Sequence, residues 1–143
     1  MSQIDVREIS KDEWNKISYE SHLLVFNEQK DRSKEKIDFA LLATLQPEDK
    51  LMGYVTCKEM DSDHVYWQYG GIYPDARYTK HTLSGYCMML NYCGLKYKRI
   101  TTLIENTNKP MLKLAAKANF IIVGIRSASN AVLLEHLLEF GGK

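Results

Sequence analysis

The segment Pro74–Gly85, PDARYTKHTLSG, concentrates residues that bind anions. Arg77 and Lys80 are cations, and the small hydroxyl side chain of Thr82 can bond a phosphate oxygen or cap a helix. A stretch rich in aromatic and β-branched residues precedes the segment and an apolar stretch with helical spacing follows it, which predicts a strand-to-helix turn. Such turns bind phosphate through backbone N–H groups at the helix N-terminus. They usually carry glycines, and this one has none before Gly85.

The helices and strands before this turn are predicted from the spacing of apolar residues and from turn-forming residues. Gln3–Ile9 alternates imperfectly and predicts a short strand, after which Ser10 and Glu13 have capping-box spacing and start a helix. An uneven apolar stripe predicts a second helical stretch up to Phe26. The stretches IDFALLATL, LMGYVTCKEM and HVYWQYGGIY, separated by QPEDK and DSD, predict three consecutive antiparallel strands.

The elements after the turn alternate between helix and strand. LSGYCMMLNYCGL predicts a helix with Leu83, Cys87, Leu90 and Gly94 on its apolar face. KRITTLIEN predicts a strand, KPMLKLAAKA a helix and FIIVGIRS a strand. AVLLEHLLEF is assigned as a last strand, although its pattern fits a helix equally well. The resulting order, β-α-α-β-β-β-α-β-α-β-β, predicts one α/β domain over residues 1–143 with a mixed sheet.

Composition narrows the classes of function. The chain has 143 residues with a formal net charge of +1, so nothing demands a polyanionic partner and nucleic acid is not favoured. No apolar run is long enough to span a bilayer, so we expect no membrane partner. Three cysteines without a C-x-x-C pair fit a reducing cytoplasm and give no metal-ligand pattern.

The order of elements and two local patterns resemble the GNAT superfamily of N-acetyltransferases. In the strand–loop–helix that holds coenzyme A in that family, Ile72, Pro74, Asp75 and Arg77 match in type and spacing, while Lys80 and Thr82 replace two small residues. The second pattern, NKPMLKLAAKANF, keeps Asn108, Leu114, Lys117 and Phe120. It has Met111, Ala115 and Asn119 where the family has alanine, tyrosine and glycine. Asparagine tolerates the left-handed conformation that closes a helix, so Asn119 can replace that glycine.

The resemblance implies a GNAT-like fold with acetyl-coenzyme A as co-substrate and an amine, on a small molecule or a protein, as acceptor. The implied cofactor-binding residues are Ile72, Arg77, Tyr78, Thr79, Lys80, His81, Thr82 and Asn108. Most of this binding is by backbone N–H groups, which survive the loss of glycines where no positive φ is needed. Gly70-Gly71 predicts a bulge or a close approach, at the place where strands of the family separate to admit the pantetheine arm.

The catalytic groups are less clearly marked than the cofactor site. Deprotonation of the amine needs a base, for which His64 and Glu105 are the candidates, with Glu59 behind them. The strand before the loop lacks the glutamate that the family often places there. Ala115 cannot donate a proton, so the thiolate leaves unassisted, another group protonates it, or the chemistry is absent.

These observations leave three functions open. The first is an acyl-coenzyme A-dependent N-acyltransferase that works by direct attack of the amine. The second is a catalytically inactive GNAT-like binding or structural protein, of a kind familiar from viruses and phages. The third, an enzyme acting on a nucleic-acid base, is not favoured by the near-neutral charge. The aromatic residues of YWQY indicate a partner surface or a homodimer.

Overall fold

The structure is a computed structural model that describes residues 3–26, 36–74, 77, 79, 81–126 and, as backbone only, 131–137. The elements, in chain order, are β1 (Gln3–Ser10), α1 (Lys11–Phe26), β2 (Phe39–Gln46), β3 (Lys50–Glu59), β4 (His64–Ile72), α2 (His81–Gly94), β5 (Arg99–Glu105), α3 (Lys109–Lys117), β6 (Ile121–Arg126) and β7 (Ala131–Leu137). No helix in the described part of the chain is long and apolar enough to cross a membrane.

The strands of the described residues form one seven-stranded sheet in the order β1-β2-β3-β4-β5-β7-β6. Neighbours from β1 to β4 are antiparallel, which confirms the predicted succession of antiparallel strands. β4 and β5 are parallel, and β5, β7 and β6 are again antiparallel. The predicted mixed α/β sheet is therefore confirmed, with α2 as the crossover that a parallel pair requires.

A single helix, α1, covers both of the helical stretches predicted between Ser10 and Phe26, so the prediction of two helices there is wrong. The Ser10 hydroxyl oxygen accepts a bond from the Glu13 N–H at 3.2 Å, which confirms the predicted start. Nothing ends the helix after Ile17, since no glycine or proline follows before Phe26. Trp14, Ser18, Ser21 and His22 continue one buried stripe.

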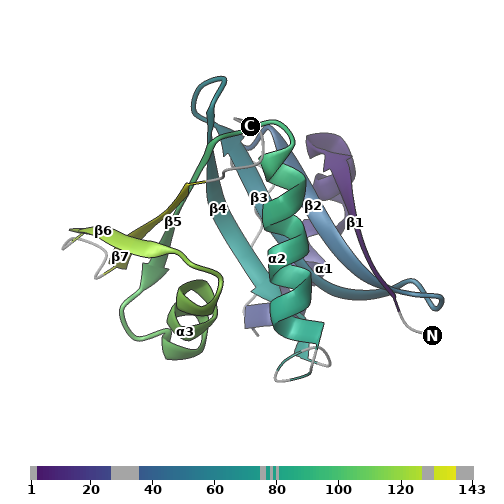
Figure 1. The fold of residues 1–143 in the computed structure, drawn as a ribbon. Helices are drawn as coiled ribbons and strands as arrows, with labels where there is room; N and C mark the ends of the chain where they lie inside the picture. Colours follow the sequence, from purple (N-terminus) through teal and green to yellow (C-terminus); the bar gives the residue numbers. More distant parts are fainter. Residues whose placement is uncertain are drawn as a thin grey trace.

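The helices α1 and α2 cover opposite faces of the sheet (Figure 1). On one face, Trp14 of α1 packs against Tyr54 of β3 with ring centroids 4.6 Å apart. On the other face, Met89 of α2 belongs to the same buried cluster as Val55. Because successive side chains of a strand point to opposite faces, Tyr54 and Val55 mark the two sides of the sheet.

The buried face of α2 agrees with the predicted one at Leu90 and Gly94 and differs from it at Leu83 and Cys87. Leu83 is exposed and Cys87 is half-buried, whereas the buried residues are Gly85, Tyr86, Met89, Leu90, Cys93 and Gly94. The reason is aromatic packing: the Tyr86 ring meets the edge of Trp67 at 5.5 Å and lies 6.0 Å from Phe120. These large rings turn the helix so that Tyr86 faces the sheet.

β4 contains a bulge at Gln68. Its partner β3 pairs Cys57 with Trp67 and the preceding Thr56 with Tyr69, so Gln68 has no opposing residue. The extra residue reverses the alternation of side chains. Strict alternation predicts Trp67 and Tyr69 on one face, and this is wrong, because paired residues share a face and Tyr69 therefore lies with Thr56 on the α1 side.

The pair Gly70-Gly71 is regularly paired with β3, so the bulge lies upstream of the glycines. The glycines predict a bulge or a close approach by a ligand backbone, whereas the close approach in the structure is made by a side chain of α1. A Cβ atom on Gly71 would overlap the side chain of Val25. Glycine at this position therefore lets the end of α1 lie against the sheet.

Helix α3 begins and ends as predicted. The Asn108 side chain accepts a bond from the Met111 N–H at 3.4 Å and caps the first turn. After Ala118, Asn119 has φ = 72°, the left-handed conformation in which asparagine replaces glycine. This turn lets the chain reverse from α3 into β6.

Candidate functional site: a cavity between two separated strands

The parallel strands β4 and β5 pair over only part of their length. Their register runs from His64 opposite Arg99 to Trp67 opposite Thr102, although β4 continues to Ile72. Beyond this point the two strands separate, as Figure 1 shows. A cavity of about 880 Å³ lies between them, which is within the usual range for ligand sites.

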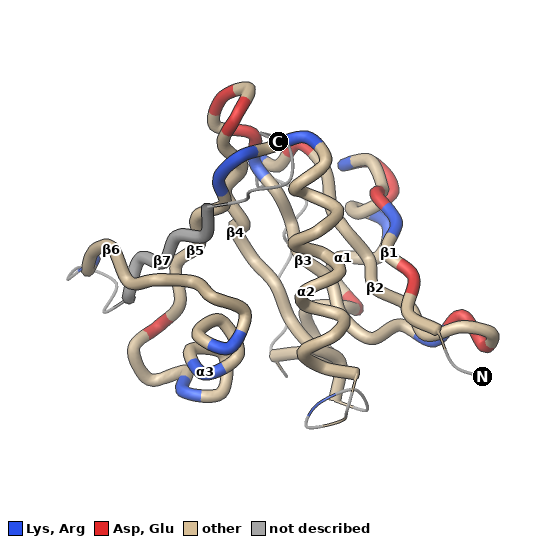
Figure 2. The backbone as a smooth tube through the Cα atoms, viewed as in Figure 1, with Lys and Arg blue, Asp and Glu red and all other residues tan. Residues whose placement is uncertain are grey.

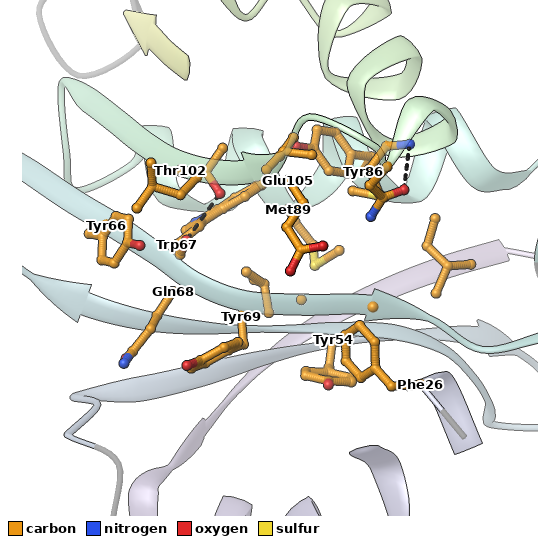
Figure 3. Close-up of a pocket in the computed structure, with 18 of the residues that line it drawn as sticks. Phe26, Tyr54, Tyr66, Trp67, Gln68, Tyr69, Tyr86, Met89, Thr102 and Glu105 are labelled. Atoms are coloured by element: carbon orange, nitrogen blue, oxygen red, sulfur yellow. Dashed lines mark hydrogen bonds between the residues drawn. The ribbon is translucent and has the colours of Figure 1, made fainter. Parts of the chain in front are cut away.

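The cavity is lined from both faces of the sheet (Figure 3). On the α2 side the lining includes Trp67, Tyr86 and Met89, together with Met111 of α3. On the α1 side it is formed by His22, Phe26, Tyr54, Tyr66, Gln68 and Tyr69. The separated strands thus leave one space that residues from both sides of the sheet line.

Three of the predicted site residues line this cavity. Ile72 ends β4, Glu105 ends β5, and Asn108 caps α3. In Figure 3 the carboxylate of Glu105 projects into the space between the strands. Glu105 is the single carboxylate among the described lining residues, and its role as a base stays a prediction.

The other candidate base, His64, lies at the opposite end of β4 and does not line the cavity. Its Nδ1 faces Arg99 Nη2 at 3.1 Å, and its Nε2 faces Thr101 Oγ1 at 2.8 Å. A guanidinium only donates, so Nδ1 accepts and Nε2 carries the proton that it donates to Thr101. This geometry ties the β4–β5 pair together and gives the catalytic prediction for His64 no support.

Arg77 binds backbone oxygens. Its Nε donates to the carbonyl of Ile72 at 2.9 Å and its Nη2 to the carbonyl of Val25 at 2.6 Å. Because Val25 lies in the last turn of α1, the guanidinium links the end of α1 to the end of β4. Two of its five N–H donors are thereby used, and the predicted phosphate contact would have to use the others.

Thr79 and Thr82 cap the N-terminus of α2. The Thr79 hydroxyl oxygen accepts from the His81 N–H at 3.2 Å, and the Thr82 hydroxyl oxygen accepts from the Thr79 N–H at 3.2 Å. These bonds satisfy N–H groups that a pyrophosphate would otherwise meet. The predicted cofactor residues Tyr78 and Lys80 lie outside the described residues.

The backbone of β4 supplies polar groups along the cavity. Ladder bonds to β3 alternate, and the N–H of Tyr73 donates to the carbonyl of Met52 at 2.8 Å. The N–H and C=O groups of Gly70 and Ile72 are therefore directed away from β3, towards the side where β5 has separated. An extended, amide-bearing chain can bind to such an edge as an added strand would.

Ala115, at the position of the family's tyrosine, is fully buried in the core and does not line the cavity. Tyr86 from α2 is the tyrosine that lines the α2 side. Burial raises the pKa of its phenol well above the ordinary value, so the phenol stays protonated at neutral pH. Such a weak acid can donate a hydrogen bond to a departing thiolate, whereas full proton transfer to it would be uphill.

Several lining residues were missed by the sequence analysis, above all Phe26, Tyr66, Gln68, Tyr69 and Tyr86. Tyr66, Gln68 and Tyr69 belong to the aromatic segment that predicted a partner surface. Their position in the cavity depends on the bulge and on the separation of β4 from β5, neither of which leaves a period in the sequence. For Tyr86 the signal was present, but an incorrect helix face hid it.

Charge is unevenly spread around the site. β4 carries no Lys, Arg, Asp or Glu. Figure 2 shows basic residues on α3, where Lys109, Lys113 and Lys117 are exposed and one turn apart. Among the described lining residues the charged side chains are thus Glu105 and Arg126, and a basic helix lies beside the α2 side of the cavity.

Comparison with known proteins finds similar structures but no similar sequences. The sequence matches no protein-family model and no curated protein sequence. Among solved structures, the spermidine N-acetyltransferase SpeG from Vibrio cholerae superposes with a TM-score of 0.72 at 12% identity, over 95% of this chain and 94% of that one. A domain from Methanocaldococcus jannaschii gives 0.71 at 17% identity, over 96% and 100%.

A further match is a protein from Acinetobacter baylyi that is provisionally assigned as an acetyltransferase. It gives a TM-score of 0.69 at 13% identity, over 98% of this chain and 96% of that one. These matches cover nearly whole chains on both sides. The chain has the fold of the GNAT superfamily of N-acetyltransferases, and at these identities the likeness extends to the fold alone.

Proposed function

We propose that residues 1–143 form one acyltransferase domain, which transfers an acetyl group from acetyl-coenzyme A to the nitrogen of an amine. The observation that carries this proposal is the separation of β4 from β5 into a cavity lined from both faces, with Glu105 projecting into it. A thioester can enter from the α2 side and an amine from the α1 side, so that the two meet between the strands.

The residues present fit the pantetheine part of the coenzyme better than its phosphates. The N–H and C=O groups of Gly70 and the N–H of Ile72 would bind its amides, since the Ile72 carbonyl already accepts from Arg77, and Met89 and Met111 supply apolar contact. At the phosphate end, Arg77 is bonded to backbone and Thr79 and Thr82 are bonded to each other and to the helix end. The exposed lysines of α3 are cations beside the α2 side that a phosphate could use.

The coenzyme supplies an activated acyl carbon and a thiolate leaving group. Glu105 accepts one proton from the bound ammonium, directly or through water, and frees the nitrogen lone pair. A C–N bond forms as the C–S bond breaks, and the thiolate leaves with the electron pair. The second proton of the nitrogen ends on the thiolate, so the products are an amide, a thiol and one proton released through Glu105. Tyr86 can donate a hydrogen bond to the sulfur as it leaves.

A calorimetric titration with acetyl-coenzyme A, followed by an assay of thiol release, tests this proposal. A ligand at 100 times its dissociation constant should stabilise the protein by about 2.7 kcal/mol in thermal unfolding. Met111→Trp should fill the α2 side and abolish binding, while Ala116→Trp, on the exposed side of the same helix, should leave it unchanged. No binding at millimolar coenzyme would overturn the proposal.

The second candidate is a GNAT-like protein that no longer catalyses. Two observations favour it: the buried Ala115 in place of the family's tyrosine, and the loop side chains that bond within the protein. The same titration separates the two, since coenzyme binding without thiol release, across a varied set of amines, would support this second reading.

A further inference from the structure

The α1 side of the cavity has an aromatic wall that depends on the bulge in β4. Without the extra residue, Tyr66 and Tyr69 would point to opposite faces. With Gln68 bulged, Tyr66 pairs with Lys58 and Tyr69 with Thr56, which share one face of β3. Both rings therefore line the α1 side, where Phe26 and His22 of α1 complete the wall.

The α1 wall has exposed apolar surface. Phe26 is 42% exposed, and its ring is tilted against that of His22 with 4.8 Å between the ring centroids. Tyr66 and Tyr69 are half-buried, whereas Tyr54 beneath them is almost fully buried and contributes to the core. Figure 3 shows Tyr54, Tyr69 and Phe26 on the same side of β4. Ring faces of this kind bind apolar groups, and they attract cations through the ring quadrupole.

Two polar acceptors accompany these rings. The side-chain oxygen Oε1 of Gln68 is buried and has no hydrogen-bond partner among the described residues. A buried amide oxygen without a partner costs free energy, which a ligand donor would recover. The carboxylate of Glu105 is the second acceptor, so an ammonium or amine N–H would find partners of the right kind.

We infer that the α1 side binds a primary monoamine carried on an apolar alkyl or aryl body. Its nitrogen lies between the Gln68 amide oxygen and the Glu105 carboxylate, and its body lies against Phe26, Tyr66 and Tyr69. This inference rests on the proposed function and names the class of its acceptor.

The charges of the cavity select against two other kinds of amine. A polyamine carries several positive charges, and the described lining offers one carboxylate together with one guanidinium, Arg126. An amino acid would bring a carboxylate of its own towards Glu105, unless Arg126 held it. The acceptor named for the spermidine N-acetyltransferase of Vibrio cholerae is therefore a poor fit to this cavity.

The experiment compares acceptors that differ in one feature. Acetyl-coenzyme A is supplied at saturation, and thiol release is followed with 2-phenylethylamine, with phenylalanine, which adds only a carboxylate, and with spermidine. We expect kcat/KM for 2-phenylethylamine to exceed the other two by tenfold or more. An equal or higher value for phenylalanine would assign Arg126 to a substrate carboxylate and overturn the inference, as would a preference for spermidine.

A matched pair of variants locates the site. Phe26→Ala should raise KM for 2-phenylethylamine about tenfold and leave the KM for acetyl-coenzyme A unchanged. Tyr19→Ala removes an aromatic ring of the same helix that is 47% exposed and does not line the cavity, and it should change neither constant. Gln68→Leu should also weaken the amine and leave the coenzyme unaffected. Equal KM values for Phe26→Ala and the unaltered protein would contradict the inference.

Direct titration of 2-phenylethylamine into the protein without coenzyme separates the two proposals. Binding that is weakened by Phe26→Ala supports the amine site even if acetyl-coenzyme A does not bind, in which case the proposed function alone fails. Coenzyme binding with no measurable binding of 2-phenylethylamine, alone or in the presence of coenzyme, overturns the inference and leaves the proposed function standing.

Discussion

The hydroxyl of Thr102 donates to the backbone carbonyl of Trp67 at 3.1 Å, at the last position where β4 and β5 are in register. Both residues are buried. Beyond this bond the strands separate and the cavity begins, so a side chain ends the shared ladder. This bond therefore lies at the inner end of the space between the strands.

Replacing Thr102 by valine removes this hydrogen bond at the inner end of the cavity and should therefore destabilise the protein. The substitution keeps the shape of the side chain and removes the donor, leaving a buried carbonyl with one partner fewer. We expect the free energy of unfolding to fall by about 1–2 kcal/mol, as measured by urea denaturation. Thr102→Ser keeps the hydroxyl and is the control for this bond. The interpretation fails if the valine variant is as stable as the protein with threonine.

Gly71 and Val25 are a second pair of residues in close contact. A substitution at Gly71 that destabilises the protein can be partly compensated by a substitution at Val25. Gly71→Ala places a methyl group on the side chain of Val25 and should destabilise the protein by about 1–3 kcal/mol through overpacking. The double variant Gly71→Ala/Val25→Ala should recover part of this loss. A double-mutant cycle in denaturant measures the coupling, and additive effects would show that the two residues do not meet.

Much of the fold could be predicted from local signals. The three antiparallel strands, the start of α1 at Ser10 and the left-handed Asn119 depend on residues near each other in the chain, and the structure confirms each of them. The division of α1 into two helices is wrong because an uneven apolar stripe was taken for a break. The buried residues of α1 form one continuous stripe that packs on the sheet, a contact between residues distant in the sequence.

The candidate site could be predicted only in part, because its shape depends on long-range pairing. Glu105 was predicted from its place at a strand end and Asn108 from the resemblance to the GNAT pattern, and both line the cavity. The aromatic wall was not found, since one unpaired residue, Gln68, reverses the faces of β4 after it. A period of two cannot reveal that reversal, and the aromatic segment was read as a partner surface.

Variants of Arg77 test whether this residue stabilises the fold or binds a ligand. Its bonds to Ile72 and Val25 predict that Arg77→Ala lowers stability, by about 1 kcal/mol after allowance for its exposure. Arg77→Lys should not rescue it, because an ammonium lacks the planar fork that reaches both carbonyls. Denaturation measures the first effect and coenzyme titration the second. A large loss of coenzyme affinity at unchanged stability would reverse the assignment and restore the phosphate contact.

The hydrogen bond between Tyr97 and Glu59 should make the free energy of unfolding depend on pH below neutrality. The Tyr97 phenol donates to Glu59 Oε2 at 2.5 Å, and this bond is the main cause that lowers the pKa of the Glu59 carboxyl. A lowered folded-state pKa contributes stability above the unfolded value, near 4.5, and that contribution is lost as pH falls through the folded pKa. Tyr97→Phe should therefore be less stable at pH 7, with a deficit that narrows below about pH 4.5. Urea denaturation across this range measures it, and a deficit independent of pH would assign the effect to packing.

Glu105 provides the test of mechanism. Glu105→Gln keeps the size of the side chain and removes the base, so the rate of acetyl transfer should fall by about 10²-fold or more, with the affinity for acetyl-coenzyme A unchanged. The difference in rate between Glu105→Gln and the unaltered protein should become smaller as pH rises, because a larger fraction of the amine then loses its proton to solvent without a base. Glu48→Gln, in the exposed turn between β2 and β3, is the matched control and should leave the rate unchanged. Rate measurements from pH 6 to pH 10 decide between the two roles of Glu105: a deficit that is constant across pH would show that Glu105 positions the amine and does not deprotonate it.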